Sequence, residues 1–252
     1  MVEPLLPPEP PKPKGGRPRV PDRAALTGII FVLKTGIQWE WLPQEMGSGS
    51  GMTCWRRLRD WHAAGVWEHL QRLLLEHLHE AHRIDWRRAL ADAASVPAPA
   101  GGPATGPNPT DRGKAGTKQH VSTDGQGLPR AGEVTAANLP EGQRWEQLVD
   151  AIPPLRRRRG RPRRRPKKLH ADKAYDSRAK RRALRRRKIR PRIARRRVES
   201  RERLGRQRWK AERTVSWLHR NRRLRIRYER RDDIHEAFFT LGRILILWNF
   251  YT

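Results

Sequence analysis

Three acidic residues lie beside apolar residues in a chain that is dominated by basic ones. Lysine and arginine total 56, whereas aspartate and glutamate total 26. Asp92 follows Leu-Ala, Asp172 follows Leu-His-Ala, and Glu212 follows Trp-Lys-Ala. Taken singly, each carboxylate could pair with one of the many arginines. Taken together, we interpret the three as a set of metal ligands for nucleic-acid chemistry, contributed by two strands and one helix.

The expected secondary structure explains how these carboxylates could act together. Alternate residues of a strand share a face, so Asp92 projects with Leu90, and Asp172 projects with His170. Glu212 lies on an expected helix, where it shares a face with Arg208, Val215, Ser216 and His219. Two strand aspartates and a helix glutamate can hold two divalent ions about 3.5–4 Å apart for phosphodiester displacement. Hard oxygen ligands favour Mg²⁺, and we expect Mn²⁺ to be a possible substitute.

The charge of the chain indicates a polyanionic partner. A formal net charge of +30 and a pI near 11.7 favour DNA or RNA, because each neutralised phosphate releases a counterion. The basic residues form runs and do not line one face of an amphipathic helix, which argues against a membrane surface. The hydrophobic content of 36% and the ten tryptophans suffice for a core, so the chain is not a disordered basic tail.

Several classes of site and location are disfavoured. The single cysteine, Cys54, excludes an internal disulfide and a cysteine-rich zinc site, and it fits a cytosolic compartment. His77, His79 and His82 lack a supporting carboxylate pattern, so we do not expect zinc. The sequence has no Gly-rich phosphate loop, so we expect no nucleotide cofactor. Residues 1–20 hold seven prolines, and we interpret them as an arm. Residues 237–251 are apolar, but Arg243 interrupts them and they are too short to span a membrane comfortably, so we interpret them as a buried helix.

Three short helices are predicted before residue 85. The first begins near Asp22, which we expect to cap it, and ends near Gly36. The apolar positions of the three helices are Leu26, Ile29, Ile30 and Leu33; Trp55, Leu58 and Trp61; and Trp67, Leu70, Leu74 and Leu78. Arg56, Arg57 and Arg59 on the middle helix favour a helix-turn-helix-like DNA-binding region. A helical cap on the next domain explains the same pattern equally well.

The remainder of the chain predicts an α/β fold with a mixed sheet and flanking helices. We expect strands at 88–96, 119–123, 128–136, 169–172 and 189–194, and a Gly/Pro/Thr loop at 101–116. We expect helices ending near residue 152, at 177–188 and at about 204–222. The last helix is marked by Ile234, Phe238, Leu241, Leu245 and Trp248 at alternating spacings of four and three.

Residues 156–168 contain ten basic residues in thirteen, broken by Gly160, Pro162 and Pro166. We interpret this segment as a solvated loop that binds the phosphates of nucleic acid. The alternative is a run of charged residues that is solvated and binds nothing. Our candidate DNA contacts are Arg56, Arg57, Arg112, Lys114, Arg156, Arg157, Arg158, Arg161, Arg163, Lys173 and Arg213.

Several motifs resemble those of bacterial transposases of the insertion-sequence-five family. They are 105–114 (TGPNPTDRGK), 169–176 (LHADKAYD), 212–219 (ERTVSWLH), 222–224 (RRL) and 227–230 (RYER), with 36–39 (GIQW) and 54–58 (CWRRL) nearer the start. The resemblance spans nearly the whole chain. Departures are Ala93 and Ala94 after the first aspartate, Ala174 in place of glycine, and 138–141, which lacks a His-Asp pair. The start of the sequence also lies later than the family pattern leads us to expect.

The resemblance implies a ribonuclease-H-like catalytic domain with an Asp-Asp-Glu metal triad at Asp92, Asp172 and Glu212. It implies a proline-rich arm at 1–20, a helical DNA-binding region at 21–84 and a catalytic domain at 85–252. Such enzymes cut double-stranded DNA at the inverted-repeat ends of their element and join the freed 3′ ends to target DNA, and we expect a homo-oligomer on DNA in the bacterial nucleoid. Two other functions stay open: a catalytically inactive DNA-binding relic or regulator, and a structural RNA-binding protein.

Overall fold

The computed structural model describes residues 1–252 except 10, 12, 14, 16–17, 157–159 and 195–200. The helices are α1 (Asp22–Thr35), α2 (Gly51–Ala63), α3 (Val66–Glu80), α4 (Glu141–Asp150), α5 (Arg178–Arg186), α6 (Arg201–His219), α7 (Arg222–Arg225) and α8 (Asp232–Tyr251), with 3-10 turns η1 (Glu3–Leu5), η2 (Trp39–Trp41), η3 (Gln44–Met46) and η4 (Lys173–Tyr175). The strands are β1 (Arg88–Pro97), β2 (Gly106–Pro107), β3 (Ala115–Asp124), β4 (Pro129–Ala136), β5 (Lys168–Ala171) and β6 (Arg190–Ile193).

One mixed sheet forms the centre of the α/β region. β3 pairs antiparallel with β1 on one side and with β4 on the other, whereas β5 pairs parallel with both β1 and β6. The short β2 pairs with the start of β3. Three long antiparallel strands followed by two parallel ones, with helices on both faces, confirm the predicted ribonuclease-H-like fold class.

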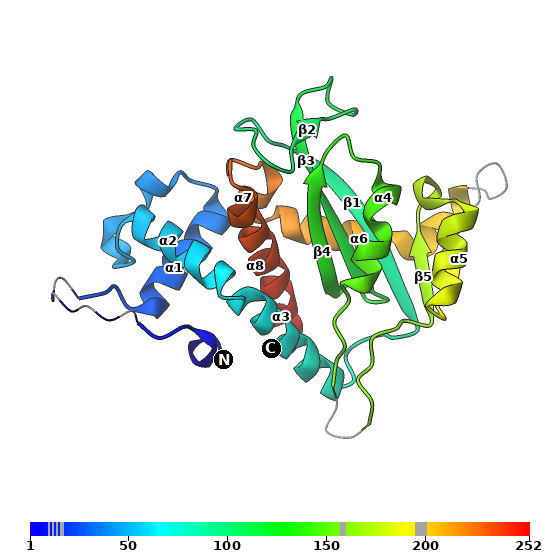
Figure 1. Ribbon diagram of the computed structural model, residues 1–252, viewed down its shortest axis with the longest axis horizontal. Coiled ribbons are helices and arrows are strands. Elements are labelled where there is room, and N and C mark those ends of the chain that lie inside the picture. Colours follow the sequence, from blue (N-terminus) through cyan, green and yellow to red (C-terminus); the bar gives the residue numbers. More distant parts are fainter. Residues whose placement is uncertain (10, 12, 14, 16–17, 157–159, 195–200) are drawn as a thin grey trace.

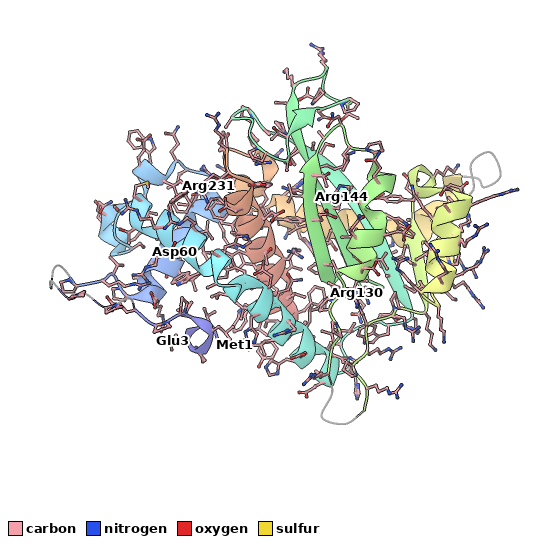
Figure 2. The ribbon with its side chains drawn as sticks, viewed as in Figure 1. Met1, Glu3, Asp60, Arg130, Arg144 and Arg231 are labelled. Carbon is pink, nitrogen blue, oxygen red and sulfur yellow. The ribbon has the colours of Figure 1, made fainter. Side chains whose placement is uncertain are left out.

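The two faces of the sheet carry different helices. On one face, α4 and α5 cover a hydrophobic cluster that includes Ala89, Ala91, Leu169, Trp145 and Leu184. Arg144 of α4 also pairs with Glu133 of β4 at 2.9 Å (Figure 2). On the other face lie α6 and α8, and Figure 1 shows α4 in front of the strands and α6 behind them. The side chains of each strand therefore alternate between these two helical layers.

The amino-terminal helices share a core with the carboxy-terminal helix. Ile29 of α1, Leu58 of α2, Leu74 of α3 and Phe238 of α8 are all buried in one cluster. In Figure 1, α8 lies between these helices and the sheet. Packing is therefore continuous across the predicted boundary at residues 84 and 85. No helix in the described part of the chain has both the length and the apolar character to span a membrane.

Most predicted elements are confirmed, and two details were wrong. Asp22 is the first residue of α1 and does not cap it; the cap position is Pro21, and the Asp22 carboxylate contacts Arg57. The last helix is buried only through Leu247, because Trp248 and Tyr251 are exposed. Gly36 does end α1, in the left-handed conformation that glycine favours.

Gly28 is the point of closest approach between α1 and α2. A Cβ atom at this position would lie 2.8 Å from the Cys54 sulfur and 2.8 Å from Ser48 Cβ. Replacing a mid-helix glycine by alanine usually stabilises a helix by about 1 kcal/mol. Here we expect Gly28→Ala to destabilise the protein by about 1–3 kcal/mol, because overpacking dominates. Urea unfolding measures this, with Thr27→Ala on the exposed side as the matched control; a stabilised Gly28→Ala variant would contradict the packing.

Candidate active site

Asp92 and Asp172 lie on neighbouring parallel strands. β1 and β5 are in register, with Leu90 opposite His170. Continuing this register by two residues places Asp92 opposite Asp172, which follows β5 directly and keeps an extended backbone. Each carboxylate accepts a hydrogen bond from the next backbone N–H, from Ala93 at 3.0 Å and from Lys173 at 2.5 Å. The two aspartates therefore occupy equivalent positions on adjacent strands.

The face that carries these aspartates is covered by α6. Gln119 of β3 lies opposite Ala94, and its amide oxygen contacts Nε2 of His219 on α6 at 3.2 Å. Ala94 and Asp92 share a face of β1, because residues two apart in a strand point the same way. His170, which shares a face with Asp172, experiences the charge of Lys210 on α6. Both aspartates therefore project toward the layer that contains Glu212.

α6 is fixed to the sheet by its buried side. Ala211, Thr214 and Leu218 are buried at the spacing of one helix face. Lys210 donates to the carbonyl of Gly125 at 2.8 Å and Thr214 donates to that of Gly127, so the helix is tied to the β3–β4 turn. These contacts set which face of α6 points away from the core.

Glu212 is exposed on the flank of α6. It lines an open groove of about 560 Å³ together with Val215, Ser216 and His219, the neighbours predicted from helical spacing. Arg220, Arg222 and Arg225 complete the groove. The described residues include no group of three or more His, Cys, Asp or Glu side chains that could hold a metal ion. The two aspartates thus lie on or directly after neighbouring strands and Glu212 lies on α6, and within the described residues the three carboxylates do not form such a group.

The electrostatic surroundings of the aspartates are cationic. The pKa of His170 is lowered to about 4, first by burial and then by the charges of Arg88, Arg192, Lys168 and Lys210. His170 is therefore neutral at pH 7, and four cations act on the site from β1, β5, β6 and α6. A site in this field can attract phosphate, and its carboxylates can attract metal cations.

The predicted DNA contacts fall into three groups. Those that are exposed or partly exposed are Arg56, Arg112, Lys114, Arg156, Arg161, Arg163 and Lys173. Arg157 and Arg158 lie outside the described residues. Arg57 is buried and Arg213 is partly exposed, and the guanidinium groups of both make contacts within the protein.

Arg57 and Arg213 have identifiable structural partners. Arg57 is only 6% exposed and contacts the Asp22 carboxylate and the Val20 carbonyl. Arg213 donates to the Gln126 carbonyl at 2.6 Å and stacks over Trp209 and Trp217 at 4.7 and 4.5 Å. The burial of Arg57 argues against a DNA contact by its guanidinium group, whereas Arg213 is partly exposed and stays a predicted DNA contact.

The 156–168 segment is less loop-like than predicted. Leu155 and Arg163 form an isolated antiparallel bridge, Pro166 is buried, and Arg164 donates to the Ile152 carbonyl at 2.9 Å. Lys168 already belongs to β5. The segment is therefore anchored at its carboxy-terminal half, while Arg156 and Arg161 remain exposed.

Sequence reasoning missed a buried polar chain behind the groove. It links Arg223, Glu229, His235, Gln119 and His219. The signal available was Gln119, a polar residue in an otherwise buried strand, where it is 2% exposed. The Arg223–Glu229 pair is a buried ion pair whose two side chains approach to 2.5 Å.

Comparison with known proteins gives consistent matches. The family described as "Transposase DDE domain" matches residues 84–250, and the family "Putative transposase of IS4/5 family" matches residues 1–71. The chain is 54% identical over 149 residues to "Putative transposase for insertion sequence element IS402" of Burkholderia cepacia, covering 59% of this chain and 71% of that protein. It is 57% identical over 113 residues to "Insertion element IS402 uncharacterized 16.2 kDa protein" of the same organism, covering 43% and 76%.

Among solved structures, the Mos1 strand transfer complex matches with 15% identity, covering 95% of this chain and 79% of that one, at a TM-score of 0.29. The Mos1 paired-end complex with the left transposon end gives 16% identity, 96% and 80% coverage and the same TM-score. These scores are too low to add to the fold assignment, which rests on the sheet and on the family match. The match over residues 84–250, together with the identity to the IS402 protein, shows that the chain belongs to the DDE-domain transposases of bacterial insertion sequences.

Proposed function

We propose that Asp92, Asp172 and Glu212 are the metal-binding carboxylates of this DNA transposase. The observation that supports the proposal is the parallel register of β1 and β5, in which Leu90 lies opposite His170, two residues before each aspartate, on the face covered by α6. Paired hard-oxygen donors on a fixed sheet fit Mg²⁺, and Mn²⁺ can replace it. Glu212 would be the third ligand, from α6, which covers the same face of the sheet.

The bound ions would supply activation of the attacking oxygen and stabilisation of the leaving oxygen, with two ions about 3.5–4 Å apart. The residues of the chain position the carboxylates and bind the DNA. The strands hold Asp92 and Asp172 in place, and Lys173 and the exposed arginines neutralise phosphates of the double-stranded DNA. Water cleaves a phosphodiester at the element end and leaves a 3′-hydroxyl; that hydroxyl then displaces a 3′-oxygen in the target strand.

The same proposal assigns a different function to each of three segments of the chain. Residues 1–20 are an arm, 21–84 bind the inverted-repeat ends, and 85–252 cut and join DNA as a homo-oligomer. The separate family matches to residues 1–71 and 84–250 support this division. The exposed Arg56 of α2 supports a DNA-facing surface on the helical region.

The basic segment should set the salt dependence of DNA binding. Replacing Arg156, Arg161 and Arg163 by glutamine should weaken binding nearly uniformly across sequences, because phosphate contacts carry no base readout. The slope of log affinity against log salt should flatten by about 0.9 per lost phosphate contact. The matched control replaces the same residues by lysine, which keeps the charge and should keep the slope. An unchanged slope in the glutamine variant would exclude this segment from the DNA contact.

Glu212 is tested against Glu229 in a magnesium-dependent end-cleavage assay. Glu212→Gln keeps the size of an exposed side chain and removes its charge, so cleavage should collapse while end binding persists. Glu229→Gln alters a buried pair with Arg223, so it should lower stability and leave cleavage measurable at a temperature where the variant is folded. The opposite pattern would overturn the assignment of Glu212.

A second function, DNA binding without catalysis, is favoured by one observation. Among the residues described, no three metal-binding side chains are gathered into a group. An inactive relic or a regulator would retain the basic surface and bind element ends. The same cleavage assay on the parent protein decides: end binding with no cleavage in Mg²⁺ or Mn²⁺ would establish this second function.

A further inference from the structure

Three side chains of α6 donate hydrogen bonds to three consecutive carbonyls of the turn between β3 and β4. The pairs are Lys210 with Gly125 at 2.8 Å, Arg213 with Gln126 at 2.6 Å, and Thr214 with Gly127. Glu212 lies between these donors in the sequence but on the opposite side of the helix, because residues 210, 213 and 214 share one side. Gly127 has a φ of +92°, and a Cβ atom there would lie 3.0 Å from the Thr214 hydroxyl. The turn and the helix are therefore in close contact.

Asp124, the last residue of β3, holds the same turn from within the protein. The residue is fully buried, and its Oδ1 accepts from the backbone N–H of Gln126 at 2.8 Å and of Leu128 at 2.9 Å. Its own carbonyl accepts from the N–H of Gly127 at 3.2 Å. Its Oδ2 accepts from the N–H of Asp85, three residues before β1, at 2.8 Å. Asp124 therefore connects the turn to the segment that enters β1.

Each of the three peptide units in the turn is bonded to Asp124 on one side and to α6 on the other. A trans peptide unit is planar, and its N–H and C=O groups point in opposite directions. The unit of residues 125 and 126 joins Asp124 to Lys210, the unit of 126 and 127 joins it to Arg213, and the unit of 127 and 128 joins it to Thr214. Because each unit is rigid, a displacement of Asp124 alters all three bonds to α6.

The rotation of α6 about its own axis determines where the Glu212 carboxylate lies. Side chains end about 5–6 Å from the axis of a helix, so a rotation of about 10° moves a carboxylate by about 1 Å. A misplacement of about 1 Å can lower a reaction rate on the order of a hundredfold. Ala211 and Leu218 bury α6 through apolar contacts, which have no preferred direction. The hydrogen bonds to the turn are directional, and they therefore restrict the rotation.

We propose that Asp124 is a positioning residue for Glu212, and that it acts through the β3–β4 turn and the rotation of α6. The proposal rests on the proposed function, because it takes Glu212 to be a metal ligand. Asp124 lies opposite Ala89 of β1, three residues before Asp92, and its buried carboxylate accepts from three backbone N–H groups. Asp124 therefore serves the site without contacting DNA or metal.

Mn²⁺ binding reports the position of Glu212 without requiring cleavage. Electron paramagnetic resonance of free Mn²⁺ gives the affinity of the full chain on an element-end duplex that already ends at the cleaved bond. Thr214→Val removes the donor to the Gly127 carbonyl and should weaken Mn²⁺ binding on the order of tenfold, as expected for loss of a group that orients a metal ligand. Thr214→Ser keeps the hydroxyl and should bind Mn²⁺ like the parent. The matched control Thr135→Val removes a buried hydroxyl that contacts His120, and it should leave the Mn²⁺ affinity unchanged.

The same measurement tests Asp124 itself. Asp124→Ala should weaken Mn²⁺ binding on the order of tenfold. Asp124→Asn should regain most of this loss, because its amide oxygen can accept from both N–H groups of the turn. Combined with Glu212→Gln, neither Thr214→Val nor Asp124→Ala should weaken Mn²⁺ binding further, because both act through Glu212.

The outcomes separate this inference from the proposed function. If Glu212→Gln weakens Mn²⁺ binding but Thr214→Val does not, or if Thr135→Val weakens it equally, the positioning role is wrong and the proposed function stands. Further weakening in the double variants would also overturn the positioning role. If Glu212→Gln keeps the Mn²⁺ affinity of the parent, the proposed function is wrong and this inference fails with it. If Asp124→Ala does not fold, the Thr214 variants decide.

Discussion

Replacing Asp92 or Asp172 by asparagine is expected to lower magnesium-dependent end cleavage on the order of a thousandfold or more. Each substitution removes one of the two proposed metal-binding carboxylates on neighbouring strands, and several kcal/mol of transition-state stabilisation would be lost with the metal. Asparagine keeps the size of the side chain and an oxygen that can accept from the following N–H. Folding and DNA binding should therefore persist, as checked by circular dichroism and an end-binding assay.

Asp176→Asn is the matched control for this experiment. Asp176 lies four residues beyond Asp172, in the same basic segment, but its carboxylate accepts from Arg181 at 2.7 and 3.0 Å. The pair is partly buried, with side chains 16% and 18% exposed, so its loss should lower stability by about 1–3 kcal/mol and leave cleavage intact at a temperature where the variant is folded. Full cleavage by Asp92→Asn, or equal inactivation by Asp176→Asn, would count against the proposed centre.

Arg223→Met should produce the largest loss of stability, about 3–5 kcal/mol in the free energy of unfolding. The substitution leaves Glu229, which is only 6% exposed, as a buried carboxylate without its guanidinium partner. It also removes the donor to the Gly36 and Ile37 carbonyls, which connect α7 to the end of α1. Urea unfolding measures the change, and Arg231→Met, which breaks the exposed pair with Asp233, is the control expected to leave stability nearly unchanged.

The same pair should make stability depend on pH in the acid range. Burial alone would raise the pKa of Glu229, but His235 and Arg223 outweigh it and lower that pKa. A carboxylate with a lowered pKa in the folded state stabilises the protein above its unfolded pKa, near 4.3, and loses this contribution as the pH falls through the folded value. The parent should therefore lose stability below about pH 4.3, and Arg223→Met should lose less over that range. If the free energy of unfolding fell equally in both proteins below about pH 4.3, the pair would contribute nothing to this pH dependence.

Strand positions were predictable where they depend on local sequence, that is, on the alternation of apolar residues and on turn residues. The strand predicted at 88–96 is β1 within one residue, and the strand predicted at 128–136 is β4 within one residue. Alternation along β1 also gave the face shared by Leu90 and Asp92. Nothing local in the sequence, however, states which strands pair. The parallel register of β1 and β5, which brings Asp92 and Asp172 together, joins segments about 80 residues apart.

Side-chain partners that the sequence does not reveal explain why Arg57 is buried and why Arg213 makes contacts within the protein. Arg57 lies on a helix rich in arginine and looked like a DNA contact, yet Asp22, 35 residues earlier, holds it inside. Arg213 follows Glu212 in a basic helix, yet two tryptophans one turn away on either side and the Gln126 carbonyl hold it. In a chain with a net charge of +30, composition cannot distinguish arginines that face DNA from arginines that pair within the fold.

Anomalous diffraction from crystals of the full chain with Mn²⁺ and an element-end duplex tests the central claim most directly. The account predicts two manganese peaks about 3.5–4 Å apart beside Asp92 and Asp172, with the Glu212 carboxylate from α6 ligating one of them. The scissile phosphate should complete their coordination. Manganese bound elsewhere in the presence of the duplex, or a Glu212 carboxylate that stays in the open groove away from both ions, would contradict it.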